Sequence, residues 1–323
     1  MKQSPATDLF RRHPDNPILS SSHLPYQANT VFNAGATQVG DDIVLLMRVE
    51  DRRGISHFSV ARSSDGISNW RIEERPSIMP DPDSYPEEIW GIEDSRITYL
   101  EEKSLWAITY TSWSEFGPLV SLATTVDFQD FQRQGPVTPP ENKDAALFPI
   151  RFNGRWAMIH RPVAQKEGTG AHIWISFSPD LRHWGGHRII LQARGDAWWD
   201  TSKIGLGPPP LKTQDGWLIL YHGVKTTGGG IIYRLGLALL DLNDPTRVIA
   251  RCDEWVFAPE KEYEVSGDVD KVVFPCGWVP EGDHLRLYYG AADSYIALAT
   301  ASVSELLAWL KQHNVYSSGR IHM

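Results

Sequence analysis

Short runs of apolar, β-branched and aromatic residues recur along the whole chain, and clusters of Gly, Pro, Asn or Asp separate them. This spacing is typical of antiparallel strands joined by hairpins. The pattern predicts strands at residues 43–47, 56–61, 105–111, 120–124, 156–160, 173–177, 217–221, 235–240, 285–289 and 296–301. We therefore expect an all-β protein.

A turn sequence repeats within this pattern. Asp65, Asp127 and Asp180 each follow an apolar run and precede an aromatic residue, and Asp241 takes the same place in a modified turn. These aspartates are 62, 53 and 61 residues apart. A period of about 50 to 60 residues that holds four short strands is typical of a propeller blade. Five such units fit the 323 residues, so the sequence predicts a single five-bladed β-propeller over residues 1–323.

A helical pattern is clear only near the C-terminus. Within residues 302–312, Ser302 or Ser304 can cap a helix whose apolar stripe is Leu306, Leu307 and Leu310. We expect a short peripheral C-terminal helix there. We also expect an N-terminal extension over residues 1–15 and a loose tail over residues 317–323.

Composition and charge narrow the classes of partner. The formal net charge is -9 and no block of Lys and Arg is present, so we expect no nucleic acid partner. The polar N-terminus and the absence of an apolar run of about 18 residues indicate a cytoplasmic protein without a membrane partner. The sequence leaves the oligomeric state open, with a homo-oligomer as one option.

Two composition features bear on ligands. The chain has 13 Trp and 11 Tyr, more than core packing usually needs, and such an excess favours stacking on sugar rings, although a single Trp more often packs in the core. Cys252 and Cys276 lack metal-ligand spacing, so we expect reduced, buried thiols, no metal site and no bound cofactor.

The strongest candidate for chemistry is Asp94, which lies between Glu93 and Arg96 in the segment 89–96. A carboxyl group shielded from water has a raised pKa and can act as a general acid, whereas one paired with Arg stays ionised. The sequence alone does not decide between Glu93 and Asp94, and a structural salt bridge is an equal alternative to catalysis.

Several polar and cationic residues lie at strand ends, where the inner strands of a propeller converge. Taken singly, each is as well explained by a turn, a solvated charge or a structural histidine. Together the cations would form a local anion site in an acidic protein, and phosphate suits their donors. The set consists of Asn33, Arg48, Lys143, His160, Arg161, Lys203, His222 and Tyr233.

An ordered set of motifs resembles the mannoside phosphorylases of glycoside hydrolase family 130, which are five-bladed β-propellers. The motifs lie at residues 16–19, 31–35, 91–96 (GIEDSR), 143–149, 203–210, 221–224, 267–269, 274–276 and 289–293. The resemblance implies inverting phosphorolysis of β-mannosides, such as mannobiose or mannooligosaccharides, to α-mannose 1-phosphate and a shortened acceptor.

The resemblance also assigns roles by motif position. Asp94 falls on the proton donor, thought to act through the mannosyl 3-hydroxyl, and inorganic phosphate is a co-substrate in place of activated water. The phosphate ligands fall on Lys143, Arg161, Lys203, His222 and Tyr233, and the mannosyl contacts on Asn33, Arg48 and Asp293.

Two positions depart from the family pattern. Ser95 follows the acid where the family often has Pro, and Lys143 stands where some relatives carry Arg, which changes a bidentate phosphate contact into a point charge. A β-mannoside hydrolase on the same fold and a non-catalytic sugar-binding propeller are the alternatives. The segments 81–88, 165–170 and 192–199 are the expected acceptor-side walls, with Trp198 or Trp199 as a stacking platform.

Overall fold

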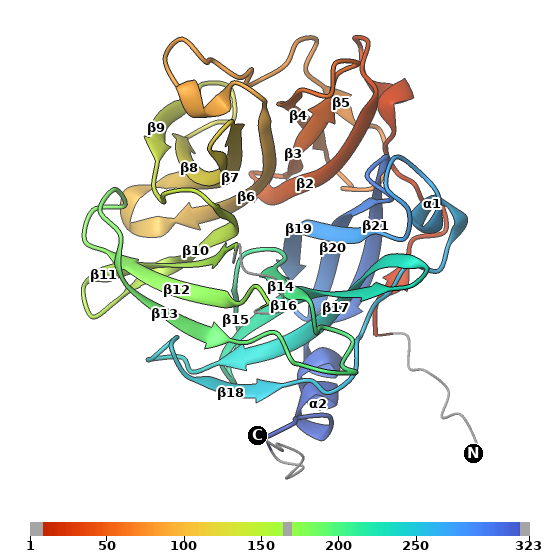
Figure 1. Cartoon of the computed structure of the whole chain (residues 1–323). Coiled ribbons are helices and arrows are strands. Elements are labelled where there is room, and N and C mark those ends of the chain that lie inside the picture. Colours follow the sequence, from red (N-terminus) through yellow and green to blue (C-terminus); the bar gives the residue numbers. More distant parts are fainter. Residues whose placement is uncertain (1–8, 164–169, 317–323) are drawn as a thin grey trace.

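The computed structural model describes residues 9–163 and 170–316. Its strands form five antiparallel sheets arranged as a ring, which confirms the five-bladed β-propeller (Figure 1). The first four sheets, in chain order, are β2 (Thr30–Val39), β3 (Asp42–Glu50), β4 (Ser56–Ser63) and β5 (Arg71–Ile72); β6 (Ile92–Leu100), β7 (Leu105–Ser114), β8 (Gly117–Thr125) and β9 (Gln132–Pro136); β10 (Asn142–Phe152), β11 (Arg155–Pro162), β12 (Ile173–Ser178) and β13 (Gly185–Leu191); and β14 (Lys203–Leu206), β16 (Trp217–Thr227), β17 (Gly230–Leu240) and β18 (Val248–Arg251), with β15 (Leu211–Lys212) paired to β16.

The fifth blade closes the ring with both ends of the chain. Strands β19 (Val273–Glu281), β20 (His284–Ala291) and β21 (Tyr295–Ser302) are completed by β1 (Arg11–Arg12), whose residues pair with Thr300 and Ala299. Two residues of the expected N-terminal extension, Arg11 and Arg12, are thus the outer strand of this blade. Two residues were too few for a strand pattern, and only the exposed edge of β21 gives them a partner.

The middle strands of the blades are buried on both faces, and for this reason their apolar runs were visible in the sequence. All ten predicted runs lie within strands, namely β3, β4, β7, β8, β11, β12, β16, β17, β20 and β21. Trp156 on β11 and Trp217 on β16 are fully buried, as are most of their neighbours along each strand. Burial of these strands between adjacent blades supplies the core.

The repeated aspartates make the same turn in four blades. Asp65 Oδ1 accepts hydrogen bonds from the backbone N–H groups of Ile67 and Ser68, and Asp127, Asp180 and Asp241 accept equivalent pairs. These turns join the third strand of a blade to its fourth. An Asp side chain that bonds its own backbone two residues on fixes such a turn locally, and the repeat seen in the sequence is therefore the blade repeat.

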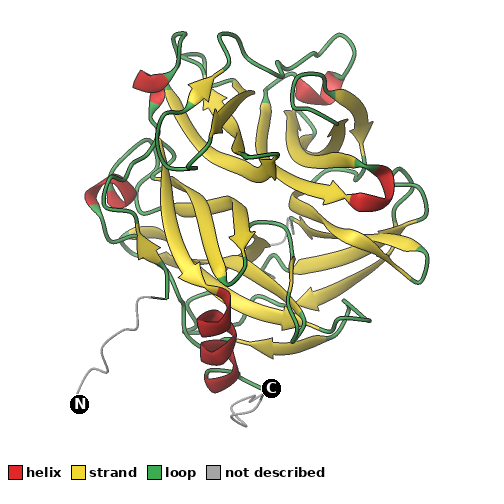
Figure 2. Cartoon of the chain, turned by 180° about the vertical axis from the view of Figure 1, so that it is seen from behind, coloured by secondary structure: helices red, strands yellow, loops and turns green. Residues whose placement is uncertain are grey.

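Helix is limited to short pieces (Figure 2). The predicted C-terminal helix is α2 (Val303–Gln312), capped by Ser302 Oγ, which accepts from Glu305 N at 3.1 Å, and its leucine stripe is buried. The others are α1 (Glu262–Val265) and the single turns η1 (Ser21–His23), η2 (Pro86–Glu88) and η3 (Glu101–Lys103). In the described ranges no helix has the length and apolar character needed to cross a bilayer. Both cysteines are free and buried, as predicted.

Candidate active site

The first strand of each blade lines the central channel, where β2 contacts β6 and β19, and β10 contacts β6 and β14. Three of these strands carry the same irregularity. Asn33, Asp94 and Asp144 have positive φ values of 44°, 53° and 55°, and the strand register shifts at each of them. A bulge changes the direction in which a side chain of the strand points. The three blades therefore present one amide and two carboxylates to the channel.

Asp94 is held by two hydrogen bonds to its Oδ1. Asn33 Nδ2 donates at 2.9 Å and Arg48 Nη1 donates at 3.1 Å. Arg48 Nη2 also donates to Glu93 Oε1 at 2.9 Å, and the Asp94 side chain is only 3% exposed. The structure thus brings together three residues predicted for the acid and sugar site, and it gives Glu93 a supporting contact.

The ionisation of this group follows from its neighbours. Burial raises the pKa of Asp94, but Arg48, Lys143 and Arg96 together outweigh burial and hold that pKa below its ordinary value. Of the two environments considered from the sequence, the structure shows the carboxylate paired with Arg. Asp293 lies in the β20–β21 hairpin and differs, because burial and the nearby Asp94 and Glu93 raise its pKa to about 7 despite Arg48.

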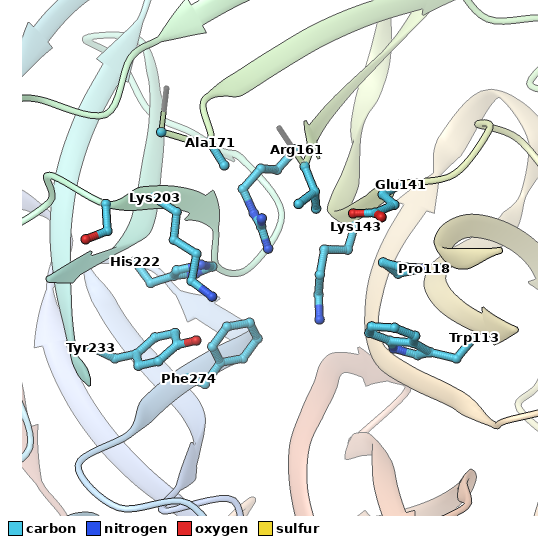
Figure 3. Close-up of a pocket in the computed structure, with 14 residues that line it drawn as sticks. Trp113, Pro118, Glu141, Lys143, Arg161, Ala171, Lys203, His222, Tyr233 and Phe274 are labelled. Atoms are coloured by element: carbon cyan, nitrogen blue, oxygen red, sulfur yellow. The ribbon is translucent and has the colours of Figure 1, made fainter. Parts of the chain in front are cut away.

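A cavity of about 550 Å³ opens beside this acid cluster. All five predicted phosphate ligands line it, namely Lys143, Arg161, Lys203, His222 and Tyr233 (Figure 3). Asp94 itself is not among the lining residues. Lys143 connects the two groups, because its Nζ lies 3.8 Å from Glu93 Oε2 and 3.9 Å from Asp94 Oδ2.

Asp144 is the residue that sequence reasoning missed. Its carboxylate is fully buried, and its Oδ2 lies 2.7 Å from Arg161 Nε and 3.5 Å from His222 Nε2. Its Oδ1 lies 3.7 Å from Arg96 Nη2 and has no hydrogen-bond partner in the described part of the chain. Burial raises the pKa of Asp144, but Arg161, with Lys143 and Arg96, holds that pKa well below its usual range. Asp144 is therefore the permanent counter-ion around which the cations are arranged.

A signal for Asp144 was present in the sequence. Asn33, Asp94 and Asp144 are 61 and 50 residues apart, which is the blade period, and each precedes a small residue. The close packing around Asp144 also explains a glycine. A Cβ at Gly205, on β14, would collide with Asp144 Oδ2 and the His222 ring, so no other residue fits there without displacing the pair.

The groups on this side of the cavity are suited to an anion. Burial lowers the pKa of Lys203 to about 8, with Arg161 as a further cause, so the lysine is still charged at neutral pH. Burial also lowers the pKa of His222 to about 3 and raises that of Tyr233 to about 12. The imidazole is therefore neutral and the phenol keeps its proton, and both offer donors without adding charge.

The opposite wall of the cavity is aromatic and apolar. Trp113 and Pro118 form it, with Glu141 beside them, across from Lys203, His222 and Tyr233 (Figure 3). One wall thus suits an anion and the other a neutral ring.

The segments expected as acceptor-side walls contribute little to this cavity. None of the residues 81–88 or 192–199 lines the cavity, and residues 165–169 lie outside the described part, whereas Gly170 is a lining residue. Trp199 is incorrect as a stacking platform, because it is only 5% exposed and stacks on Tyr221, with ring centroids 5.7 Å apart. Trp198 is covered by the Arg194 guanidinium at 4.0 Å. Sequence showed the aromatic residues but not which faces were already packed.

Metal chemistry was not expected, and in the described ranges no three His, Cys, Asp or Glu side chains gather as a metal site.

Comparison with known proteins gives consistent results. A family model described as beta-1,4-mannooligosaccharide phosphorylase (glycoside hydrolase family 130) matches residues 1–312. A beta-1,2-mannobiose phosphorylase from Listeria innocua is 40% identical over 257 residues, which is 80% of this chain and 69% of that protein. A beta-1,4-mannooligosaccharide phosphorylase from Ruminococcus albus is 31% identical over 321 residues, covering 97% and 94%.

A solved structure is similar over nearly the whole fold. It is a complex of beta-1,2-mannobiose phosphorylase from Listeria innocua with beta-1,2-mannobiose, and it superposes with a TM-score of 0.85 at 31% identity, covering 94% of this chain and 99% of that chain.

Proposed function

The chain belongs to glycoside hydrolase family 130 and is a glycoside phosphorylase acting on β-mannosides, and from its site we propose an inverting reaction in which Asp94 supplies the proton. Inorganic phosphate attacks the anomeric carbon, the glycosidic bond breaks, and the proton of Asp94 passes to the leaving oxygen, through the mannosyl 3-hydroxyl. The products are α-mannose 1-phosphate and a shortened acceptor.

The observation that carries this proposal is the position of the five phosphate-ligand candidates on one cavity, next to Asp94. Lys143, Arg161 and Lys203 supply positive charge, and His222 and Tyr233 supply neutral donors. A dianion needs such compensation when it leaves water. In the described part of the chain, the acid cluster around Asp94 is linked to this cavity by Lys143.

The proton on Asp94 requires an explanation, because its pKa is lowered in the free protein. Lys143 is one cause of that lowering, and it also faces the cavity. Phosphate bound against Lys143 brings negative charge near Asp94 and offsets the effect of the lysine, which raises the pKa of the carboxyl group. Binding of phosphate thus favours the protonated form of Asp94.

For the linkage we propose β-1,2-mannosides, mannobiose in particular. Support comes from the relative at 40% identity and from the solved structure with the TM-score of 0.85 and 31% identity, both beta-1,2-mannobiose phosphorylases from Listeria innocua, whereas the beta-1,4-mannooligosaccharide phosphorylase is 31% identical.

A β-mannoside hydrolase is the second candidate, because one carboxylate, Glu141, lines the cavity in the described part of the chain. An inverting hydrolase needs such a group to activate water. Under phosphorolysis Glu141→Gln leaves phosphate-dependent turnover in place, whereas under hydrolysis it abolishes turnover.

The deciding experiment incubates the protein with β-1,2- and β-1,4-mannobiose, each with and without phosphate. We expect α-mannose 1-phosphate from the β-1,2 compound only when phosphate is present. Release of mannose at the same rate without phosphate would establish the hydrolase.

Asp94→Asn tests the acid. We expect turnover to fall by about 10²- to 10⁴-fold, the usual contribution of a positioned acid, while phosphate binding, measured by calorimetry, is retained. A variant that keeps near-parental rates would show that another group donates the proton.

A further inference from the structure

The arginine that follows Asp94 on β6 is buried without a close carboxylate partner. Arg96 is only 1% exposed, and the hydrogen bonds that its guanidinium makes within the described ranges all end on backbone carbonyls. Its ion pair is long, 3.7 Å from Nη2 to Asp144 Oδ1. Arg251, also buried, instead donates to Asp200 at 2.7 Å. Burial of a charge is unfavourable unless it is well paired, so ion pairing does not account for Arg96.

The carbonyls that Arg96 binds connect the acid to the fourth blade. Its Nη1 donates to Asp94 O at 2.8 Å, and its Nε and Nη2 donate to Gly207 O and Leu206 O at 3.0 Å each. A planar guanidinium offers its donors in fixed directions. We propose that Arg96 is a positioning residue, which holds the backbone of Asp94 at a fixed place relative to β14, the strand that carries Lys203.

Asp94 depends on such a contact because the strand ladder is interrupted there. Strand β6 pairs with β7 at Glu93 and again at Arg96, with a register shift between them, and Asp94 has a φ of 53°. A residue in a bulge lies outside the regular pairing, so its carbonyl needs another donor. Arg96 Nη1 is that donor.

The other end of the connection is held without Arg96. Strand β14 pairs with β16 along its whole length, from Lys203 to Leu206, and the backbone N–H of Gly207 donates to Leu220 O at 2.9 Å. Loss of the guanidinium therefore releases the acid rather than the cations of the cavity.

A displaced acid slows only a reaction that needs its proton. The inference rests on the proposed function, because it takes Asp94 as the proton donor. A sugar hydroxyl leaves slowly unless it is protonated, whereas a dinitrophenolate leaves without a proton. Misplacement of a catalytic group by about 1 Å can lower the rate by about 10²-fold. Turnover of a mannobiose should therefore depend on Arg96 much more than turnover of an activated aryl mannoside.

The test compares these two substrates at saturating phosphate. Arg96→Lys keeps the positive charge, but an ammonium group does not replace the planar set of donors. We expect kcat for β-1,2-mannobiose to fall by about 10²-fold, and kcat for 2,4-dinitrophenyl β-mannoside to change by less than about 3-fold. Asp94→Asn provides the pattern for complete loss of the acid.

The matched control is Arg251→Lys, at a buried arginine that also donates to a backbone carbonyl, that of Gln192. This variant should leave the ratio of the two rates at the parental value. The ratio is internal to each sample, so a loss of folded protein does not alter it. Arg96→Gln gives a second reading of the ratio if the lysine variant does not fold.

An equal fall in both rates in Arg96→Lys overturns the inference, because Arg96 would then have a structural role alone. A rise in KM for phosphate with an unchanged ratio also overturns it, since Arg96 would then act on the cations. Failure of the proposed function is a different result, namely turnover of both substrates without phosphate. The ratio then still reports on the acid, with water as the nucleophile.

Discussion

Two buried carboxylates, Asp144 and Asp200, form similar ion pairs with arginine. They differ in whether the cations around them line the cavity. Both are fully buried, and each accepts from the Nε of one arginine at 2.7 Å, Arg161 for Asp144 and Arg194 for Asp200. Asp200 also accepts from Arg251 Nη2 at 2.7 Å. By ion pairing alone the two clusters would be indistinguishable.

The difference lies in where the remaining donors point. Around Asp200, Arg194 Nη1 and Arg251 Nη1 donate to the backbone carbonyls of Cys252 and Gln192, and none of these charged side chains lines the cavity. Around Asp144, Arg161 lines the cavity together with Lys143 and Lys203. The Asp200 cluster therefore has a structural role, whereas the Asp144 cluster presents positive charge to a ligand. The position of a cation, rather than its pairing, therefore indicates an anion site.

The largest expected effect concerns the buried carboxylate that both clusters contain. Asp144→Asn and Asp200→Asn should each lower the free energy of unfolding by about 3 to 5 kcal/mol, because each leaves buried guanidinium groups without their counter-ion. Urea denaturation gives the values. If Asp144→Asn were as stable as the parent, Asp144 would not be the counter-ion of the cation wall.

A second pair of variants separates the clusters. Lys203→Met should raise KM for phosphate by about 10- to 100-fold, the worth of one charge-assisted hydrogen bond, without loss of stability, since burial already disfavours the charge of Lys203. Arg251→Met, at a buried side chain that does not line the cavity, should lower the stability and leave KM for phosphate unchanged.

Phosphate titrations with thermal unfolding of the same samples provide both readings. Similar effects of the two variants on KM would show that the Asp200 and Asp144 clusters do not differ in their role.

The smallest effect is a pH dependence. The pKa of Lys203 is about 8, below its ordinary value, so above that pH the free protein loses this charge and KM for phosphate should rise about 10-fold per pH unit. On the acid side, KM rises as phosphate loses its dianionic form.

Lys203→Arg should flatten the alkaline rise in KM, since a guanidinium stays charged, whereas Lys212→Arg, at an exposed lysine, should not. The alkaline limb of kcat is a separate property and depends on Asp94 holding its proton in the complex with phosphate. An unchanged alkaline limb of KM in Lys203→Arg would assign that limb to another group.

The same contrast explains which strands the sequence revealed. Middle strands such as β11 and β16 are buried between blades and show continuous apolar runs. The inner strands β2, β6, β10, β14 and β19 were not predicted, because three of them are interrupted by polar bulges at the channel and β14 is only four residues long. The strands that build the site are therefore among those that the apolar pattern did not reveal.

The candidate site likewise contains residues that the sequence revealed and residues that it did not. The identity of Asp94 and of the cations came from motifs, and the structure places them together. Asp144 was missed because nothing in its own segment of the sequence indicates a contact with Arg161 on the next strand, and Trp199 was misjudged because its packing on Tyr221 is a contact across the chain.

The sequence by itself determined the number of blades, the turn that repeats in four of them, the C-terminal helix and its cap, and the set of residues available for chemistry. These features depend on neighbours a few residues away, so they leave a local pattern. Only the tertiary structure decided that the N-terminal segment closes the fifth blade, that Asp94 is ionised in the free protein, that Asp144 organises the cations, and that Trp199 is packed against Tyr221. Each of these depends on contacts between side chains from different strands or blades, and on the burial that the closed ring imposes.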